Sequence, residues 1–547
     1  MKSDIFLSFL LAYMNILLLS PPVFDFYFTP ARREPLGLLY LKESLKQIKD
    51  INVFLYDSTI SRKVKKRAIP EHFEYLKKYY FKDLSMFSLF STYKRFGDSF
   101  TKIINYINEK DINFIAISSL FSGYHNNVEK LIIEIKKRTK ALVIVGGWAI
   151  EAEKEKLFKI SNADFFIYGD SENNFLLLIN SLKKGIIPKK KGILCRDDGI
   201  ASSLHKEKGI ASSLNQENIM NQGNALIVPH KEDKKLIFDF NVFPKRENFY
   251  YFKNKKIAKM VISRGCKFSC SFCAIHRYNN FKVRNFESII AELEYLLSIG
   301  IEIVDFEDDN LFFNRKWSIK FLNILDEFHK KGLNFTAMNG ITAINLVPFT
   351  QKAIDVGFIE FNLSLVTTNK NTARNINRPI FIEQIKKIAD INQNKIDIVV
   401  FLIAGLEENT TQTLIDDIVE LAKLPVKIGL SPLYMIPDID IFENLGLPTN
   451  RDYLRGSALY KFGKSFNREQ IVSIWKLVRM INAIKELDYS NELSENIKNF
   501  KKSVEEQKWY YKDIDEIWKD SFKFDLKFPK EIKIKKIDNS YYTLHLS

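Results

Sequence analysis

Cysteine is scarce in this chain, which has only 4 cysteines among 547 residues. So few cysteines exclude the disulfide framework that stabilises small secreted domains. Long apolar runs are also missing. The longest, Ile5 to Leu19, is interrupted by Asn15, lacks a small-residue cleavage site after it and is short for a membrane span. We therefore expect no transmembrane segment, and a folded part that begins at Met14 after an extension of residues 1–13.

Acidic residues are fewer than basic ones, and the formal net charge is +16. The lysines are scattered, as in segments 136–140 and 183–191, and no compact Arg-rich arm or aromatic-interleaved basic motif is present. A nucleic-acid partner is therefore not expected. The charge slightly favours an anionic small-molecule substrate. The length and the 46% hydrophobic content predict two or three domains with sizeable cores.

Three of the four cysteines, Cys266, Cys270 and Cys273, lie within eight residues. Three thiolates in one loop can bind three irons of a cubane iron–sulfur cluster and leave the fourth iron open to a ligand. A structural zinc site would need a fourth ligand, and the remaining Cys195 lies far upstream in a Lys- and Ser-rich stretch. Chance clustering without a metal is the other alternative. An oxygen-sensitive cluster implies a reducing, cytoplasmic setting.

The spacing C-x3-C-x-aromatic-C resembles the signature of the radical S-adenosylmethionine (radical SAM) enzymes. The resemblance implies a 4Fe-4S cluster on Cys266, Cys270 and Cys273, with S-adenosylmethionine (SAM) bound to the open iron. In that family, electron transfer splits SAM to a 5′-deoxyadenosyl radical. The resemblance also implies a one-electron reductant, such as flavodoxin or ferredoxin, as a partner.

The fold class is expected to be α/β, beginning with a doubly wound, Rossmann-like domain over residues 14–185. Continuous apolar runs bounded by polar turns are typical of strands buried on both faces of a parallel sheet. In such sheets the ligand binds outside the carboxyl ends of the strands. The expected strands are Ile16–Ser20, Asn52–Tyr56, Phe114–Ser118, Leu142–Val145 and Asp164–Tyr168. The expected helices include Leu38–Ile48, Phe100–Asn108, Val128–Arg138 and Asn173–Leu182.

Small residues after these strands resemble the fingerprint of cobalamin (B12)-binding domains: Ser118 and Leu120 after the third strand, Gly146 and Gly147 after the fourth. The resemblance implies that these four residues contact cobalamin. The family's histidine loop after the first strand is absent, since residues 21–25 read Pro-Pro-Val-Phe-Asp. Any cobalt would then lack a histidine ligand from below, as also occurs in the branch fused to radical SAM domains. A flavodoxin-like domain without this ligand is the alternative.

Residues 186–257 are expected to be a linker, with a tandem duplication in which Gly199–Leu214 repeats Gly-Ile-Ala-Ser-Ser-Leu. Two copies cannot form a solenoid, so we expect an exposed insertion. Residues 451–547 are expected to form a mostly helical C-terminal region. The helices are expected at Arg468–Leu487, Asn491–Lys508 and Ile514–Phe522, before a strand pair at Glu531–Ile537 and Tyr541–Leu546.

Residues 258–450 alternate strand and helix patterns, as a parallel barrel requires, and they resemble the partial, TIM-like (β/α)6 barrel of radical SAM enzymes. The expected strands are Lys259–Ser263, Ile303–Glu307, Asn334–Met338, Phe361–Leu365, Asp397–Ile403 and Ile428–Leu433. The helices between them include Phe286–Ser298, Ile319–Lys330 and Ile382–Ile391.

Polar residues follow several of these strands, where a barrel gathers its chemistry. The resemblance implies that Glu307 and Asp308, in an acidic run after the second strand, accept hydrogen bonds from the SAM amino group. Asn339 after the third strand and Ser364 in the fourth are expected to contact the SAM ribose or carboxylate. Arg378 is either a guanidinium partner of that carboxylate or a surface residue.

The fifth strand resembles the family's G-x-I-x-G-x-x-E adenine-binding strand, with Phe401 in place of the first glycine. The resemblance implies that Ile403 packs on the adenine and that the backbone around Gly405 hydrogen-bonds it. Phe272, between the second and third cysteines, is expected to cover the same ring. In isolation, an aromatic residue there would more often belong to an ordinary core.

Together these features predict a cobalamin-dependent radical SAM enzyme, with methylation of an unactivated carbon as the expected outcome. Rearrangement, cyclisation and oxygen insertion remain alternatives, as does a non-catalytic cluster-binding protein. A methylthio-transferring tRNA modifier is disfavoured, because that group carries a further three-cysteine domain for which this chain has no cysteines.

Overall fold

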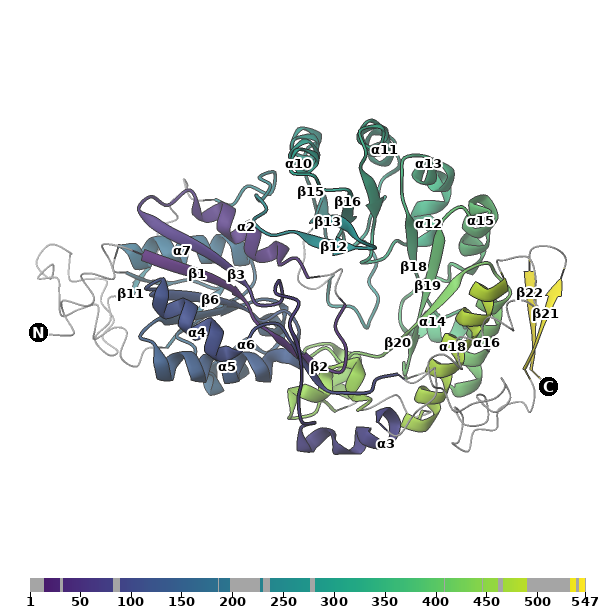
Figure 1. Cartoon of the computed structure of the whole chain (residues 1–547), viewed down its shortest axis with the longest axis horizontal. Coiled ribbons are helices and arrows are strands. Elements are labelled where there is room, and N and C mark those ends of the chain that lie inside the picture. The colour runs from purple at the N-terminus through teal and green to yellow at the C-terminus, as the bar shows by residue number, and fades with distance from the viewer. Residues whose placement is uncertain are drawn as a thin grey trace, which may run out of the picture.

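The computed structural model describes most of the chain in two large parts, an N-terminal α/β layer and a curved C-terminal sheet covered by helices (Figure 1). The described residues are 14–29, 33–81, 89–184, 186–196, 227–229, 237–275, 281–407, 409–444, 446–460, 466–488, 532–537 and 541–546.

A parallel sheet forms the centre of the N-terminal part, in the order β10-β8-β7-β6-β1-β3 with β10 antiparallel at one edge. All five expected strands are confirmed as members of this sheet. Its strands are β1 (Met14–Ser20), β3 (Ile51–Asp57), β6 (Phe114–Ser118), β7 (Leu142–Gly146), β8 (Phe165–Ile167) and β10 (Ile193–Cys195). Residues 14–19 of the apolar N-terminal run therefore form a buried strand.

Helices cover both faces of this sheet, as the doubly wound prediction requires. Helices α2 (Leu36–Leu45) and α7 (Ser171–Lys183) bury their apolar sides on one face. Helices α4 (Phe100–Glu109), α5 (His125–Arg138) and α6 (Trp148–Ile160) cover the other. The strand order reverses between β1 and β6, so the crevice outside their carboxyl ends is where a ligand is expected in such a sheet.

An excursion between β3 and α4 pairs with the segment that follows β1. Strands β2 (Val23–Asp25), β5 (Lys94–Phe96) and β4 (Val64–Lys66) pair as a small antiparallel sheet. The turn η2 (Glu71–Leu76) and helix α3 (Lys77–Tyr80) extend from it and join the same apolar core as α18 (Arg468–Asp488). Tyr79 and Lys78 of this excursion both donate to Glu469, at 2.6 and 2.7 Å.

The second part contains six parallel strands, in agreement with the predicted partial barrel. They are β13 (Lys255–Met260), β16 (Ile303–Phe306), β17 (Asn334–Thr336), β18 (Glu360–Val366), β19 (Asp397–Ala404) and β20 (Lys427–Pro432). Two isolated parallel bridges, Phe335 to Phe358 and Ile341 to Leu363, join the β17 and β18 halves, and β12 (Tyr250–Phe252) adds an antiparallel edge. The predicted position of the first strand was wrong by four residues, because Val261–Ser263 already turn into the cysteine loop.

Helices on the outside of this barrel begin at well-defined caps. Asn285, Asn314 and Thr410 accept hydrogen bonds from the first turns of α10, α11 and α16. The barrel helices are α10 (Phe286–Ser298), α11 (Arg315–Lys330), α12 (Ala343–Leu346), α13 (Thr350–Asp355), α14 (Lys370–Asn375), α15 (Ile382–Asn392) and α16 (Thr411–Ala422). A continuous apolar core runs from the strands to these helices.

Short elements complete the described chain. They are β9 (Ile187–Lys189), β11 (Ile227–Pro229), η3 (Ser122–Tyr124), β14 (Ser263–Arg264), β15 (Lys282–Val283), η5 (Val347–Phe349), α17 (Asp440–Asn444), η6 (Arg451–Leu454), η7 (Gly456–Ala458), β21 (Ile532–Ile537) and β22 (Tyr541–Leu546). Helix α18 and the terminal strand pair are confirmed. The tandem duplication and the expected helices Asn491–Lys508 and Ile514–Phe522 lie outside the described residues.

Buried charges join the two parts. Arg246 of the connecting segment is 2.9 Å from Glu34 of the N-terminal part and 2.9 Å from Glu292 of α10, and all three side chains are almost completely buried. Glu292 also accepts from Arg284, and Glu34 accepts from the Lys259 backbone N–H of β13. This chain of alternating charges ties the orientation of the domains to the strand that leads into the cysteine loop.

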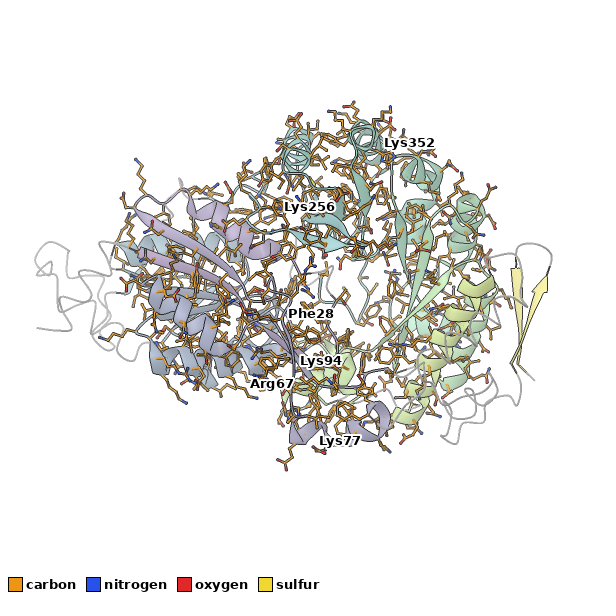
Figure 2. The ribbon with its side chains drawn as sticks, in the orientation of Figure 1. Phe28, Arg67, Lys77, Lys94, Lys256 and Lys352 are labelled. Carbon is orange, nitrogen blue, oxygen red and sulfur yellow. The ribbon has the colours of Figure 1, made fainter. Side chains whose placement is uncertain are left out.

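Basic side chains are distributed over both parts, as Lys77, Lys94, Lys256 and Lys352 illustrate (Figure 2). Within the described residues, no helix is both long and apolar enough to cross a bilayer.

Replacement of Arg246 by Met should strongly destabilise the protein. Glu34 would be left buried without its cation, and Glu292 would keep only Arg284, a loss of about 3–5 kcal/mol. We expect the melting temperature to fall by roughly 5–10 °C. Lys42→Met is the matched control, because the Lys42–Glu247 pair is partly exposed and worth at most about 1 kcal/mol. Equal melting temperatures for the two variants would contradict the role given to Arg246.

Candidate functional site: a cysteine loop at the barrel mouth

The three clustered cysteines lie in the loop that follows β13. Cys270 is buried, while Cys266 and Cys273 are half-buried. Burial raises the pKa of the Cys266 and Cys273 thiols, and the charge of Cys270 raises both further. The sulfurs are therefore close enough to influence one another.

The donor set fits an iron–sulfur cluster better than a single ion. Among the residues that the structure describes, no three His, Cys, Asp or Glu side chains converge closely enough to hold one metal ion. In a cluster each thiolate binds a different iron, so three cysteines of one loop need not converge on a point. Cys266, Cys270 and Cys273 would be the protein ligands of such a cluster.

Two carboxylates after β16 hold this loop in place. Asp308 is completely buried and accepts hydrogen bonds from the Ser263 N–H at 2.6 Å, the Ser263 hydroxyl at 2.5 Å and the Ile262 N–H at 3.2 Å. Burial raises the pKa of Asp308 to about 7, although these three bonds act in the opposite direction. Asp309 accepts from the Gly265 N–H at 2.7 Å, directly before Cys266. The acidic run thus anchors the start of the cysteine loop.

The other predicted polar residues of this edge already have protein partners. Glu307 pairs with Lys259 at 2.9 Å, and the Asn339 amide donates to the Asp308 carbonyl at 3.2 Å. Asp305 accepts from the Met338 N–H at 2.8 Å. The structure therefore brings Glu307, Asp308 and Asn339 to one edge, next to the cysteine loop. Their contact with the SAM amino group or ribose stays a prediction.

The end of β18 is backbone-strained. Val366 has a φ of +76°, which is rare for a β-branched residue, and the pairing with β19 shifts register between Ser364 and Val366. Asp417 of α16 holds the chain after this point, since its carboxylate accepts from the Thr367 hydroxyl at 2.8 Å and the Thr368 N–H at 2.7 Å. Sequence reasoning missed this strain because no glycine marks it. Such strain is often found at functional sites.

Arg378 reaches from the end of α14 to both the strained strand and the cysteine loop. Its Nη2 donates to the Ser364 carbonyl at 2.9 Å and to the Ser364 hydroxyl at 3.2 Å, and its Nη1 donates to the Cys270 sulfur at 3.7 Å. The guanidinium also lies 5.5 Å from the Phe268 ring centre and 5.2 Å from that of Phe381. Arg378 is therefore not a surface residue.

An apolar cluster beside the cysteines contains the residues predicted to hold adenine. Phe272 and Ile403 are both partly buried in it, with Val366 and Leu406 among its buried members. Gly405, at the end of β19, has a φ of +101°, which favours glycine. The structure thus brings Phe272, Ile403 and Gly405 together, although adenine binding itself stays a prediction.

The departure at Phe401 has a structural explanation. Phe401 of β19 lies opposite Gly429 of β20, and a Cβ on Gly429 would come within 2.5 Å of the Phe401 ring. The glycine missing from β19 is matched by one on the neighbouring strand, so the large side chain fits over it. The sheet therefore keeps its register despite the substitution.

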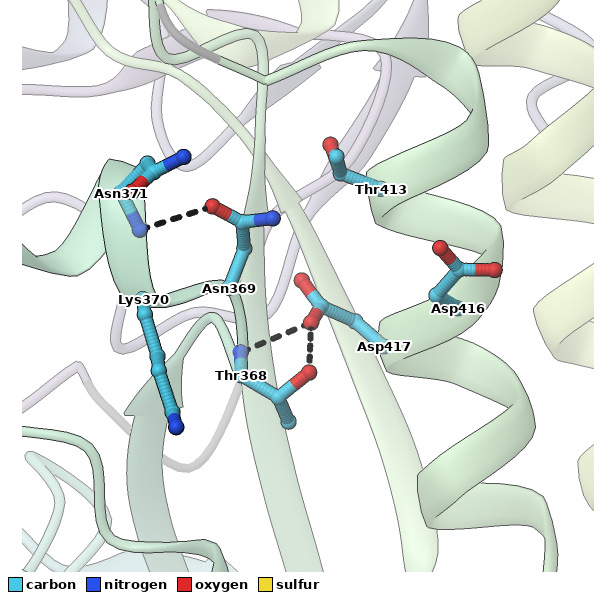
Figure 3. A pocket seen from close by; sticks show the side chains of 7 residues that line it. All are labelled: Thr368, Asn369, Lys370, Asn371, Thr413, Asp416 and Asp417. Atoms are coloured by element: carbon cyan, nitrogen blue, oxygen red, sulfur yellow. Dashed lines mark hydrogen bonds between the residues drawn. The ribbon is translucent and has the colours of Figure 1, made fainter.

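A separate open pocket of about 450 Å³ lies between α14 and α16 (Figure 3). It is lined by Thr368, Asn369, Lys370, Asn371, Thr413, Asp416 and Asp417. The carboxylate of Asp417 is already used to hold Thr368, as the dashed lines show. None of the predicted site residues lines this pocket.

The carboxyl edge of the N-terminal sheet exposes apolar side chains beside glycines. Leu120 and Phe121 after β6 are 50% and 61% exposed, and Trp148 after β7 is 37% exposed. Ser118 and Gly146 end their strands in direct register. Gly147 has a φ of +114°, and a Cβ there would lie 2.5 Å from the Ser119 carbonyl oxygen. This edge can therefore accept a large, flat, partly apolar ligand close to the backbone.

No histidine among the described residues is offered to a ligand at the β1–β6 crevice. His125 is buried, lies 3.0 Å from the Ser119 hydroxyl and pairs with Glu129 at 3.3 Å. Asp25, in the loop after β1, accepts from the Phe26 N–H and the Tyr124 and Ser457 hydroxyls. Cobalamin binding without a histidine ligand stays a prediction.

Arg455 bridges the two loops that flank this crevice. It donates to the Phe24 carbonyl after β1 at 2.5 Å and to the Gly123 carbonyl after β6 at 2.6 Å. Asp452 and Asp25 balance its buried charge at 2.8 and 3.9 Å. Sequence reasoning did not single out Arg455, because nothing local indicates that residues 451–458 return to the N-terminal part.

Residues 260–421 match the model of the radical SAM superfamily, so the chain contains a radical SAM domain. Such a domain implies a 4Fe-4S cluster and SAM as cofactors. The matched residues begin at the end of β13 and end in α16, and they include the cysteine loop, the acidic run and Arg378.

One similar curated protein is the anaerobic magnesium-protoporphyrin IX monomethyl ester cyclase of Rubrivivax gelatinosus. It is 25% identical over 231 residues, which are 40% of this chain. The match spans only 40% of that relative's own length.

Solved structures show the same multidomain fold. The radical SAM methyltransferase TsrM from Kitasatospora setae, with tryptophan and a SAM analogue bound, aligns with a TM-score of 0.55 and 14% identity, covering 79% of this chain and 75% of that chain. The cobalamin-dependent SAM radical enzyme OxsB aligns with a TM-score of 0.54 and 12% identity, covering 91% and 71%. The α/β arrangement is therefore that of multidomain radical SAM proteins.

Replacement of Asp308 by Ala should loosen the cysteine loop. Each buried donor left without its acceptor costs about 1–3 kcal/mol, and three donors meet this carboxylate. We expect a lower melting temperature and, after anaerobic reconstitution, less than half of the wild-type iron. Asp416→Ala is the control, because the Asp416 carboxylate accepts a hydrogen bond from Gln412 at the protein surface. Wild-type iron content in the Asp308 variant would refute this anchoring role.

Proposed function

We propose that this protein is a cobalamin-dependent radical SAM enzyme that acts on a small-molecule substrate. One observation carries the proposal: a three-cysteine loop at the barrel mouth, and a second ligand edge on a doubly wound sheet, occur in one chain whose fold matches such enzymes. A reduced 4Fe-4S cluster supplies a 5′-deoxyadenosyl radical from SAM, which can remove hydrogen from an unactivated carbon.

The chain's own residues would perform the binding steps. Cys266, Cys270 and Cys273 would hold the cluster, and Asp308 and Asp309 would hold their loop. Phe272 and Ile403 would enclose the adenine, which keeps water from the reacting end of SAM. Glu307 would accept a hydrogen bond from the SAM ammonium group by exchanging its present cation partner, Lys259, for it.

Cobalamin would bind at the edge formed by Ser118, Leu120, Gly146 and Gly147. The exposed Leu120 and the neighbouring Phe121 and Trp148 give this edge the apolar area that a macrocycle covers. Arg455 holds together the loops after β1 and β6, which flank this edge. Since the described residues offer no imidazole there, we propose that the protein binds cobalamin without a histidine ligand.

Methyl transfer is the outcome that we favour, with the methyl group passing from cobalamin to a substrate carbon. TsrM, which aligns over most of this chain, is a methyltransferase. Ring formation is the second candidate, because the similar protein of Rubrivivax gelatinosus is a cyclase. A small acidic one-electron donor would reduce the cluster, and the net charge of +16 favours such a partner and an anionic substrate.

Replacement of all three clustered cysteines by Ala should abolish the iron–sulfur chemistry. Anaerobically reconstituted wild-type protein should be brown, hold about four irons per chain and form 5′-deoxyadenosine from SAM and a reductant. The triple variant should be colourless and inactive in this assay. Cys195→Ala is the control and should match wild type. Wild-type protein without iron, or without 5′-deoxyadenosine, would end the proposal.

Replacement of Gly147 by Ala should weaken cobalamin binding. The new methyl group would collide with the Ser119 carbonyl, so the edge must shift. We expect at least a tenfold loss of affinity, about 1.4 kcal/mol, measured by the absorbance of added methylcobalamin. Gly37→Ala is the control, because a Cβ on Gly37 would meet nothing within 4 Å and Gly37 is not one of the residues assigned to the cobalamin edge. Equal affinities for the two variants would refute this assignment.

A further inference from the structure

We propose that Arg378 sets the reduction potential of the cluster through Cys270 rather than binding the SAM carboxylate. This inference rests on the proposed function, because it needs a cluster on Cys266, Cys270 and Cys273. Arg378 would then be a positioning residue, which acts on the cluster through the ligand Cys270.

The geometry of the guanidinium is the first argument. Both terminal nitrogens are engaged, Nη1 with the Cys270 sulfur and Nη2 with Ser364. Nε is buried and has no hydrogen-bond partner among the described residues. A carboxylate is best bound by two parallel N–H groups. Arg378 could present such a pair only by giving up its contacts with Ser364 or Cys270.

The surroundings of the guanidinium are the second argument. Phe268, from the cysteine loop, and Phe381, at the start of α15, both lie within 5.5 Å of its centre, and their rings are 6.0 Å apart. Two aromatic rings stabilise a cation and hold it in one orientation. The guanidinium is only partly exposed, so its charge acts on Cys270 with less screening than at the open surface.

The positive charge of Arg378 affects the reduction potential of the cluster. A cluster gains one negative charge when it accepts an electron from an external one-electron donor, which is oxidised in the same step. A fixed cation and an N–H donated to a ligand sulfur stabilise the reduced form more than the oxidised form, and therefore raise the reduction potential. The contact with Ser364 holds the cation in place, because the same Nη2 meets both its carbonyl and its hydroxyl.

The test is a redox titration of the reconstituted cluster without SAM, followed by electron paramagnetic resonance with dithionite as reductant. Arg378→Gln removes the charge and keeps much of the volume. We expect a more negative midpoint potential, with at least a tenfold higher ratio of oxidised to reduced cluster at a fixed potential, about 59 mV for one electron. Arg374→Gln is the control and should match wild type, because Arg374 is an exposed arginine of α14, four residues before Arg378.

A second measurement separates this role from a carboxylate clamp. SAM affinity of the oxidised, cluster-loaded proteins is measured by equilibrium dialysis with SAM itself. We expect Arg378→Gln to change it less than threefold. An unchanged potential would overturn the inference. A tenfold loss of SAM affinity would also overturn it, because that loss would identify Arg378 as a clamp on the SAM carboxylate.

Arg378→Lys keeps the inference testable if the Gln variant does not retain its cluster. Lysine keeps the cation but cannot reach Ser364 and Cys270 together. We expect a shift in the same direction as for Gln, but smaller, and a potential equal to wild type would overturn the inference. Failure of wild-type protein to bind iron would instead refute the proposed function, so the two failures are distinguishable.

Discussion

The buried carboxylate of Asp308 is the interaction on which the site depends. It accepts three hydrogen bonds from Ile262 and Ser263, where the chain leaves β13, and its neighbour Asp309 accepts a fourth from Gly265. A buried carboxylate is unfavourable unless such donors surround it. The position of the three cysteines therefore follows from the backbone one to four residues before Cys266. The acidic run after β16 suggests ligand binding when only the sequence is considered. In the structure, its members Asp308 and Asp309 hold the start of the cysteine loop.

Two buried arginines, Arg246 and Arg455, connect the parts of the molecule that surround the cysteine loop. Arg246 joins Glu34 and Glu292 and so connects the N-terminal domain, the linker and the barrel. Arg455 joins the loops after β1 and β6 to the segment that follows the barrel. Because each cation would be costly to leave unpaired, both fix the relation between the cysteine loop and the edge of the N-terminal sheet. The proposed function, in which a radical forms at one site and a group is delivered from the other, would require such a fixed relation.

Strands and helices with a clear apolar period were largely predictable. The five strands of the N-terminal sheet, the six of the barrel and helices α10 and α15 lie where the sequence patterns indicate them. The first barrel strand was misplaced, because Val261 and Ile262 continue the apolar run while Asp308 already pulls their backbone into a turn. The strained Val366 was not predictable, since strain there is imposed by β19 and Asp417 rather than by a turn residue.

The cysteine spacing and the glycines at the strand ends are local signals in the sequence. They suffice to indicate the class of chemistry, because iron ligands and a ligand that lies close to the backbone each need particular residue types at short range. Ser364, Ile262 and Phe24, which are partners of Arg378, Asp308 and Arg455, lie 14, 46 and 431 residues away from them along the chain. Such contacts depend on how the strands and domains pack, and a single chain pattern carries no information about them. Folding alone therefore placed a cation beside Cys270 and joined the two loops that flank the crevice between β1 and β6.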